Sequence, residues 1–196
     1  NLPFTLEYPD EKFLNREKIS LSLKTFEPIY NYDLLKKIVY SYIKKSSNLK
    51  IKLGTEVVGG KIDKGGTKSL VIVDLKGSKH TETFDYIINT TYAKHNRFSN
   101  WFEFPIKPVR IDLVEALIVK LPLPKISLAV MDGPFTNLVP TSKDNIFTLV
   151  HIKESILERY VPKSGIPHAK KRTKTMVNET LQKSQEWFPI LEKAEI

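Results

Sequence analysis

The stretch Phe84–Ala93 reads FDYIINTTYA and is the most informative part of the sequence for predicting the fold. Aromatic and β-branched residues favour extended backbone, and small polar residues close the run. In open α/β sheets, ligands bind outside the carboxyl ends of strands. The pattern therefore predicts a strand over Thr81–Asn89 that brings the turn after it close to a ligand.

The segments before this stretch predict a helix and further strands. Asn31 or Asp33 caps a helix whose apolar residues recur every three to four positions and form one buried face. Strands are then expected at Leu49–Leu53, Thr55–Ile62 and Ser69–Leu75, with glycine-containing turns between the later ones. The order helix, strand, three-stranded meander, strand occupies about residues 33–92.

The second half of the chain predicts an antiparallel sheet with a helix after it. An extended segment is expected at Val109–Leu121, and three shorter strands follow at Ile126–Met131, Phe135–Val139 and Asn145–His151. Helices are expected at Lys153–Tyr160 and over Val177–Leu191, and the basic run at residues 168–174 is expected in a loop. The fold class is α+β.

Composition restricts the classes of function. The 196 residues contain no cysteine, which excludes disulfides, thiolate metal sites and a cysteine nucleophile from this chain. No apolar stretch approaches the roughly 20 residues that span a bilayer, and no signal sequence is visible. We therefore expect a cytoplasmic protein without a membrane partner. The net charge of +9 comes from dispersed lysines, which favours a solvated surface over nucleic-acid binding.

The order of elements around residues 33–92 resembles the middle of FAD-dependent oxidoreductases of the D-amino-acid-oxidase-like superfamily. Gly54-Thr55-Glu56-Val57 matches a family strand whose backbone, around the valine, lies against the adenine of FAD. The turn at Thr90, Thr91 and Tyr92 matches the small-residue turn that approaches the cofactor. The resemblance implies that Val57, Thr90, Thr91 and Tyr92 contact FAD.

Two later blocks extend the resemblance to most of residues 26–192. Val130–Phe135 resembles a hairpin of the family's substrate domain, and Trp187–Leu191 resembles the end of a helix in the same domain. The substrate-binding candidates are Met131, Asp132, Phe135 and Arg110. The implied division is a substrate domain at residues 1–30 and 100–196, built on a mixed or antiparallel sheet with flanking helices. A partial Rossmann-like FAD-binding layer with the meander occupies residues 31–99.

The eight glycines include no GxGxxG motif after a strand, although binding the pyrophosphate of FAD normally needs one. The resemblance thus implies an internal fragment whose parent transfers a hydride from an amine or a hydroxy acid to FAD. The fragment alone is expected to be inactive and to bind no FAD. Its expected partners are a small-molecule substrate in the parent and the missing parts of its own parent chain.

Two other functions stay open on the sequence. A basic module for nucleic acid or another polyanion would bind with a steep salt dependence. A protein-interaction domain would use exposed edge strands. The four histidines show no metal-ligand spacing, so no metal site is expected, and His95 is the one that follows the candidate turn. No catalytic residue is assigned.

Overall fold

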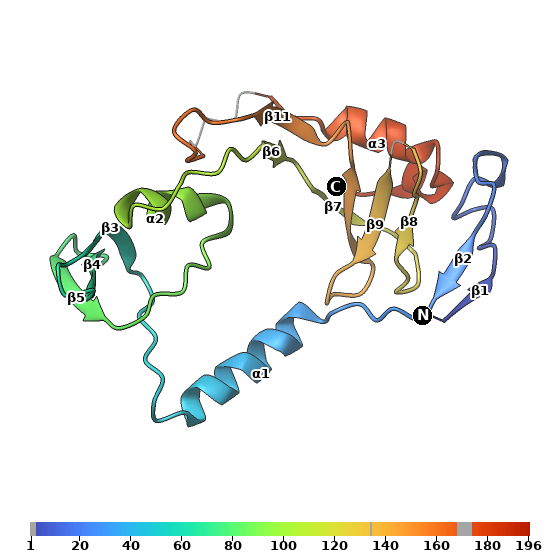
Figure 1. Ribbon diagram of the computed structural model, residues 1–196. Coiled ribbons are helices and arrows are strands. Elements are labelled where there is room, and N and C mark those ends of the chain that lie inside the picture. The colour runs from blue at the N-terminus through green and yellow to red at the C-terminus, as the bar shows by residue number, and fades with distance from the viewer. Residues whose placement is uncertain (1–2, 134, 168–173) are drawn as a thin grey trace. The chain divides into compact units, whose positions relative to one another are not determined.

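The computed structural model describes residues 3–133, 135–167 and 174–196 and shows an α+β protein with antiparallel sheets (Figure 1). The fold class predicted from the sequence is therefore confirmed. Two compact units divide the chain. The sheet unit comprises Asn1–Ser47, Leu113–Glu158 and Arg172–Ile196, and the meander unit comprises Asn48–Asp112 and Arg159–Lys171. This division differs from the expected one, because residues 31–47 group with the sheet unit and residues 100–112 and 159–171 with the meander unit.

Four antiparallel strands form the centre of the sheet unit. They are β7 (Leu117–Lys120), β10 (Ile146–His151), β9 (Thr136–Pro140) and β8 (Leu128–Ala129), which lie side by side in that order. Apolar residues alternate along β7 and β10, so that one face of the sheet carries the buried side chains. The buried ones on these two strands are Leu117, Val119, Phe147 and Leu149.

Helical segments at the end of the chain cover that buried face. Helix α3 (Val177–Gln185) leads into the 3-10 helix η3 (Pro189–Lys193), and Phe188 and Leu191 are almost fully buried in the same cluster as the sheet residues. Leu14 joins this cluster from the N-terminal segment, which also holds the hairpin of β1 (Phe4–Leu6) and β2 (Leu23–Thr25) and the 3-10 helix η1 (Arg16–Lys18). The core of the sheet unit thus joins both ends of the chain.

Helix α1 (Tyr32–Lys45) forms where the sequence predicts a helix, but it buries none of its residues. Its start is capped because the Asn31 side chain accepts a hydrogen bond from the amide of Leu34 at 3.0 Å. The expectation of a buried apolar face is wrong for this chain, since nothing in the described residues covers that face.

The meander unit is built on β3 (Glu56–Ile62), β4 (Lys68–Val73) and β5 (Lys79–Phe84), which pair in that order. The expected meander is confirmed. Two strand predictions are wrong, because Leu49–Leu53 forms no strand and β5 ends at Phe84 instead of Asn89. Both segments lack a strand partner in the described residues, and a strand needs a neighbour for its backbone hydrogen bonds.

A short helix packs on this meander. The 3-10 helix η2 (Tyr92–Lys94) runs into α2 (His95–Trp101), which lies next to β3 (Figure 1). Phe102 after α2 fills the space above Gly60, where an added Cβ atom would lie 2.7 Å from the phenyl ring. Leu70, Ile72 and Phe102 form the buried core of the unit.

The strands β6 (Ile111–Val114) and β11 (Ile156–Tyr160) pair with each other, and the boundary between the two units runs through both. The helix expected at Lys153–Tyr160 is therefore a strand, and the extended segment expected at Val109–Leu121 is broken into β6 and β7. Apart from Lys174, the basic run at residues 168–174 lies outside the described residues. Within the described ranges, every helix is too short or too polar to span a membrane.

Candidate functional site

Val57, the first of the four predicted FAD contacts, lies on β3 of the meander unit. It pairs across the ladder with Ile72, and its half-buried side chain packs against the cluster of Leu70, Ile72 and Phe102. Ile87 packs against the same cluster. The segment that follows β5 therefore shares a core with Val57.

The segment at residues 85–91, here named the exit segment, follows β5 and pairs with no strand of the described residues. The side chains of Tyr86 and Ile88 are 88% and 86% exposed, while Ile87 between them is half-buried. In the part of the chain that the structure describes, no backbone hydrogen bond joins residues 86–88 to another segment. The exit segment thus has the in–out alternation of a strand but not its hydrogen bonds.

A local hydrogen-bonded turn ends the exit segment. The Asn89 side-chain oxygen accepts from the amide and the hydroxyl of Thr91, at 3.1 and 2.7 Å, and its side-chain nitrogen donates to the carbonyl of His95 at 3.1 Å. His95 Nδ1 lies 3.1 Å from the carbonyl oxygen of Tyr92. Thr91 is therefore held by Asn89. The sequence offered a signal for this turn, since asparagine commonly caps its own backbone two residues on.

Tyr92 and Thr90 are both exposed. Tyr92 has a φ angle of +50° and a side chain that is 92% exposed. A non-glycine residue in the left-handed region costs of the order of 1 kcal/mol, so the turn holds Tyr92 there against a local penalty. Neither residue lines a closed cavity in the meander unit.

A recess of about 540 Å³ lies beside the start of the exit segment, lined by Thr67, Thr83, Phe84, Asp85 and Tyr86. The Lys68 ammonium donates to the carbonyl of Asp85 at 2.9 Å and lies 5.9 Å from the centre of the Tyr86 ring. This contact ties the exit segment to β4. No buried charge faces the recess, which remains open to solvent.

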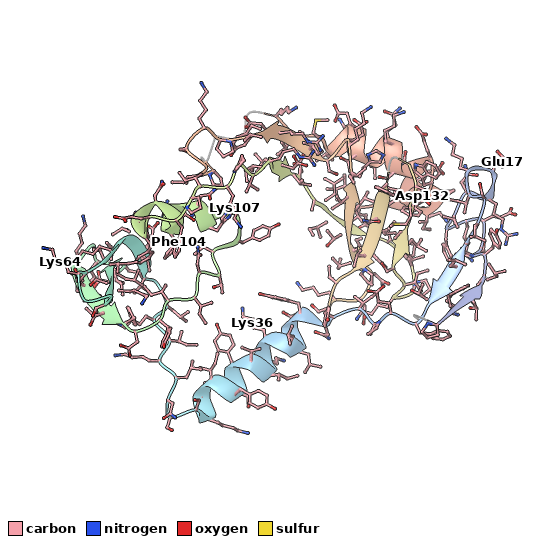
Figure 2. All side chains as sticks on the ribbon, viewed as in Figure 1. Glu17, Lys36, Lys64, Phe104, Lys107 and Asp132 are labelled. Atoms are coloured by element: carbon pink, nitrogen blue, oxygen red, sulfur yellow. The ribbon has the colours of Figure 1, made fainter. Side chains whose placement is uncertain are left out.

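The predicted substrate residues Met131, Asp132 and Phe135 lie in the sheet unit, on the loop between β8 and β9. Met131 is exposed, Asp132 has a φ angle of +63° in the turn, and Phe135 is half-buried. Asp132 is labelled in Figure 2. Pro134 of this block lies outside the described residues. The loop presents Met131 and Asp132 to solvent.

Arg110, the fourth substrate candidate, belongs to the meander unit. Its Nε lies 3.5 Å from Asp112, whose two carboxylate oxygens accept from Arg159 at 2.8 and 2.9 Å. The Arg159 hydrogen bonds hold the pKa of Asp112 below its usual value. Because Arg159 already occupies the carboxylate in a bidentate pair, Arg110 keeps an exposed guanidinium that an anion can reach.

The sheet unit contains a buried polar cluster that was not predicted from the sequence. Thr136 donates to Ser184 at 2.8 Å, and Ser155 lies 3.2 Å from Thr180 and accepts from the amide of His151 at 2.9 Å. All five side chains are almost fully buried. Thr180 and Ser184 lie four residues apart on α3, a spacing that puts both on one helix face and was a readable signal.

His151 does not activate a hydroxyl in this cluster. Its Nδ1 accepts from the amides of Lys153 and Glu154 at 3.3 and 3.1 Å, and burial lowers the pKa of the imidazole. A neutral ring with Nδ1 occupied by amides cannot take a proton from Ser155 through that nitrogen. The cluster therefore positions α3 on β9 and β10 and is not a nucleophile–base pair.

A metal site is absent from the residues that the structure covers. No group of three histidine, aspartate or glutamate side chains is arranged to hold a metal ion there. Comparisons with protein-family models, with curated proteins and with solved structures find no match to this chain. The function is therefore argued from the residues themselves.

Proposed function

We propose that this chain is part of a flavin-dependent oxidoreductase and supplies a portion of its FAD-binding layer together with its substrate-facing sheet. The observation that carries the proposal is the exit segment. Its alternating side chains are those of a strand, it shares the core of Val57, and no described strand pairs with it. The turn that ends it, at Thr90 and Thr91, is then the part that approaches the cofactor.

The segment that enters the meander supports the same conclusion. Leu49, Ile51 and Leu53 alternate with lysines and are all exposed, and their backbone groups make no hydrogen bond among the described residues. Two strand-like segments therefore flank β3–β5, one before β3 and one after β5. Strands supplied by further polypeptide would give both segments the backbone hydrogen-bond partners that they lack.

The two pairs of adjacent glycines in the described residues do not form a phosphate cradle. Gly59 and Gly60 lie inside β3, and Gly65 and Gly66 lie in the turn between β3 and β4, so that none precedes a helix. We therefore expect further polypeptide to bind the pyrophosphate of FAD and this chain to contact its adenine side. No chemical step is assigned to any of its side chains, and their expected roles are to bind and orient.

The proposal is tested by expressing the complete reading frame that encodes this chain and measuring the visible absorption of bound flavin. We expect flavin to co-purify, and we expect Ile88→Asp to lower the flavin content at least about tenfold, since a charge would then enter a buried sheet. Leu75→Asp is the matched control. Leu75 is as exposed as Ile88 but lies in the turn between β4 and β5, so its variant should keep its flavin.

Three outcomes would contradict the proposal. The first is a complete reading frame that yields protein without flavin. The second is equal flavin content in the Ile88→Asp and Leu75→Asp proteins. The third is a reading frame that ends with these residues and binds no flavin. Flavin bound to the 196-residue chain alone would instead contradict the idea that a further polypeptide completes the site.

A further inference from the structure

The loop between β8 and β9 joins an exposed aspartate to an exposed glycine. These residues are Asp132, which is labelled in Figure 2, and Gly133. No other aspartate or asparagine in the sequence is followed by glycine. The pair is therefore unique in this chain, and its chemistry is that of an aspartate whose next amide is unshielded.

An aspartate before glycine can form a ring with its own main chain. The amide nitrogen of Gly133 attacks Cγ of Asp132, a C–N bond forms, and one C–O bond of the carboxylic acid breaks. The amide proton leaves with the hydroxyl as water, and the product is a cyclic succinimide. Water then opens the ring at either carbonyl. Opening at Cγ restores aspartate, and opening at the main-chain carbonyl gives isoaspartate.

The surroundings of Gly133 leave its amide nitrogen accessible. Glycine has no Cβ of its own to crowd the nitrogen as it attacks. A Cβ added at Gly133 would have no atom of another residue within 4 Å. The attacking nitrogen is thus shielded neither by its own residue nor by neighbouring side chains.

Hydrogen bonds do not hold this part of the loop. Among the described residues, Met131, Asp132 and Gly133 take part in no hydrogen bond and no ion pair. The φ angle of Asp132 is +63°, in the left-handed region that few residues other than glycine adopt. The main chain and the side chain of Asp132 can therefore rotate until Cγ faces the amide, and no hydrogen bond breaks.

The strands on both sides of the loop are anchored. The amide of Val130 donates to the carbonyl of Thr136 at 3.0 Å, and the amide of Ile152 donates to the carbonyl of Phe135 at 2.8 Å. Thr136 is fully buried in the sheet. Rotation at Asp132 is thus a local motion that does not require the sheet unit to unfold.

Asp85 provides a comparison within the same chain. Its side chain is exposed and, like that of Asp132, accepts no hydrogen bond and joins no ion pair in the described residues. The residue after it is Tyr86, whose Cβ and ring crowd the next amide. The other aspartates each have a hydrogen-bonded or ion-paired carboxylate, and they are Asp10, Asp33, Asp63, Asp74, Asp112 and Asp144.

We infer that Asp132 and Gly133 form a site of spontaneous succinimide formation, at which Asp132 converts to isoaspartate in the folded protein. The conversion inserts one methylene group into the main chain of the loop. It also leaves the α-carboxylate, in place of the β-carboxylate, exposed beside Met131. The inference does not depend on flavin, because the reaction needs only the aspartate, the glycine amide and water.

The test incubates the full chain at neutral pH in water enriched in heavy oxygen and then digests it with trypsin in ordinary water. The peptide of residues 126–143 contains Asp132 as its only aspartate, and the peptide of residues 80–94 contains Asp85 as its only one. Ring opening adds a heavy oxygen atom to the peptide, and electron-transfer fragmentation distinguishes isoaspartate from aspartate. We expect both signals at Asp132 and several-fold less of each at Asp85.

A synthetic peptide with the sequence of residues 128–137 measures the reaction without the fold. We expect the folded chain to react within about threefold of the peptide rate, since no hydrogen bond has to open first. Gly133→Ala should slow the reaction several-fold, because its Cβ crowds the amide. Gly65→Ala is the matched control. It adds the same methyl group at another open position, after a lysine, and should leave the rate at Asp132 unchanged.

A second readout identifies the product by its free α-carboxylate. A carboxyl methyltransferase specific for isoaspartate should transfer a labelled methyl group from S-adenosylmethionine to the incubated chain. Asp132→Glu should lose this labelling, because a glutamate at this position cannot form the succinimide. Circular dichroism of the incubated chain should show that the sheet is kept.

Several results would overturn the inference. They are the absence of isoaspartate at Asp132, equal conversion at Asp85 and Asp132, and equal rates in the Gly133→Ala and Gly65→Ala proteins. A folded chain that reacts more than about tenfold more slowly than the peptide would show that the loop is held in an unreactive conformation. No flavin is measured, so a failure here is distinct from a failure of the oxidoreductase proposal.

Discussion

The carboxylate of Glu115 accepts the amide hydrogen of Met176 at 2.6 Å, and Met176 is the residue immediately before α3. The two residues are 61 positions apart in the chain. Thr175 also donates its hydroxyl to this carboxylate, at 3.0 Å. Met176 has no side-chain cap of its own. Glu115, between β6 and β7, therefore serves as the cap of a helix that lies far away in sequence, where a negative charge is favourable.

We expect Glu115→Ala to lower the free energy of unfolding of the sheet unit by about 0.5–2 kcal/mol, since the part-buried start of α3 loses the acceptor that caps it. Glu115→Gln keeps an acceptor oxygen and should cost less. Urea unfolding followed by the fluorescence of Trp187, which lies in the sheet unit, measures both variants. Equal stability of the alanine variant and the original chain would contradict this role.

Glu186 links the two ends of the sheet unit and should make its stability sensitive to acid. Its carboxylate accepts from Lys183 and Lys18, each at 2.9 Å, and these hydrogen bonds lower its pKa from 4.5 to about 2. Because the pKa is depressed in the folded state, the stabilisation is present above pH 4.5 and is lost as pH falls through about 2.

The change that tests this is Glu186→Gln, which removes the titrating charge but keeps the shape of the side chain. The melting temperature of the variant should fall less steeply than that of the original chain as pH drops through this window. Because the pair is exposed, high salt should reduce the difference between the two proteins. Parallel pH profiles in low salt would show that the two lysines contribute nothing measurable.

His151 gains a positive charge when it binds a proton, whereas Glu186 loses a negative one. Both protonations should nevertheless lower the stability of the folded sheet unit in acid. Burial lowers the pKa of its imidazole below 6.5, so the unfolded chain binds a proton more readily than the folded one. The stability that neutral His151 provides is therefore complete above about pH 6.5 and decreases as pH falls through the lower pKa of the folded state.

Two substitutions separate charge from hydrogen bonding at this position. His151→Asn keeps an acceptor for the amides of Lys153 and Glu154, whereas His151→Leu leaves both amides without one. We expect the leucine variant to lose about 1–3 kcal/mol and the asparagine variant to lose less. Both should show a flatter pH dependence of unfolding near neutral pH. An unchanged slope in either variant would assign the pH dependence to another group.

Gly165 should be much less tolerant of alanine than Gly77, although both have positive φ angles, +69° and +82°. An added Cβ at Gly165 would lie 2.4 Å from Ile106 and 2.8 Å from the Asn96 amide, whereas Gly77 has nothing within 4 Å. Gly77→Ala should cost about 1–2 kcal/mol from the backbone alone, and Gly165→Ala clearly more. Unfolding monitored by the fluorescence of Trp101, which lies in the meander unit, gives the loss of stability of each variant. Equal losses would show that Asn96 and Ile106 move aside for the added Cβ.

The sequence predicted those elements whose partners are near in the chain. The meander β3–β5 was readable because alternating residues and glycine turns lie within one continuous stretch. The segment Lys153–Tyr160 was assigned to the wrong class, since its apolar spacing suits a helix as well as a strand. Its actual partner, β6, lies more than 40 residues earlier in the chain. Local spacing carries no information about such a pairing.

The candidate site shows the same limit. Val57 and Ile87 share a core because the exit segment packs back against the meander, which follows from the predicted order of elements. The polar cluster of His151, Ser155 and Thr180 was missed because its members come from β10, the loop after it and α3. The exposure of α1 could not be predicted either. A periodic apolar face indicates that a helix packs against something, but it does not show whether the packing partner lies in the same chain.

Because the two units are interleaved, the chain passes from one to the other at residues 47, 112, 158 and 171. Neither unit can be produced by cutting the gene at a single place. During synthesis, the meander can assemble while β7–β10 are still being made. The sheet unit takes longer, because the bridge between Lys120 and Glu195 can form only after the whole segment between these two residues has been made.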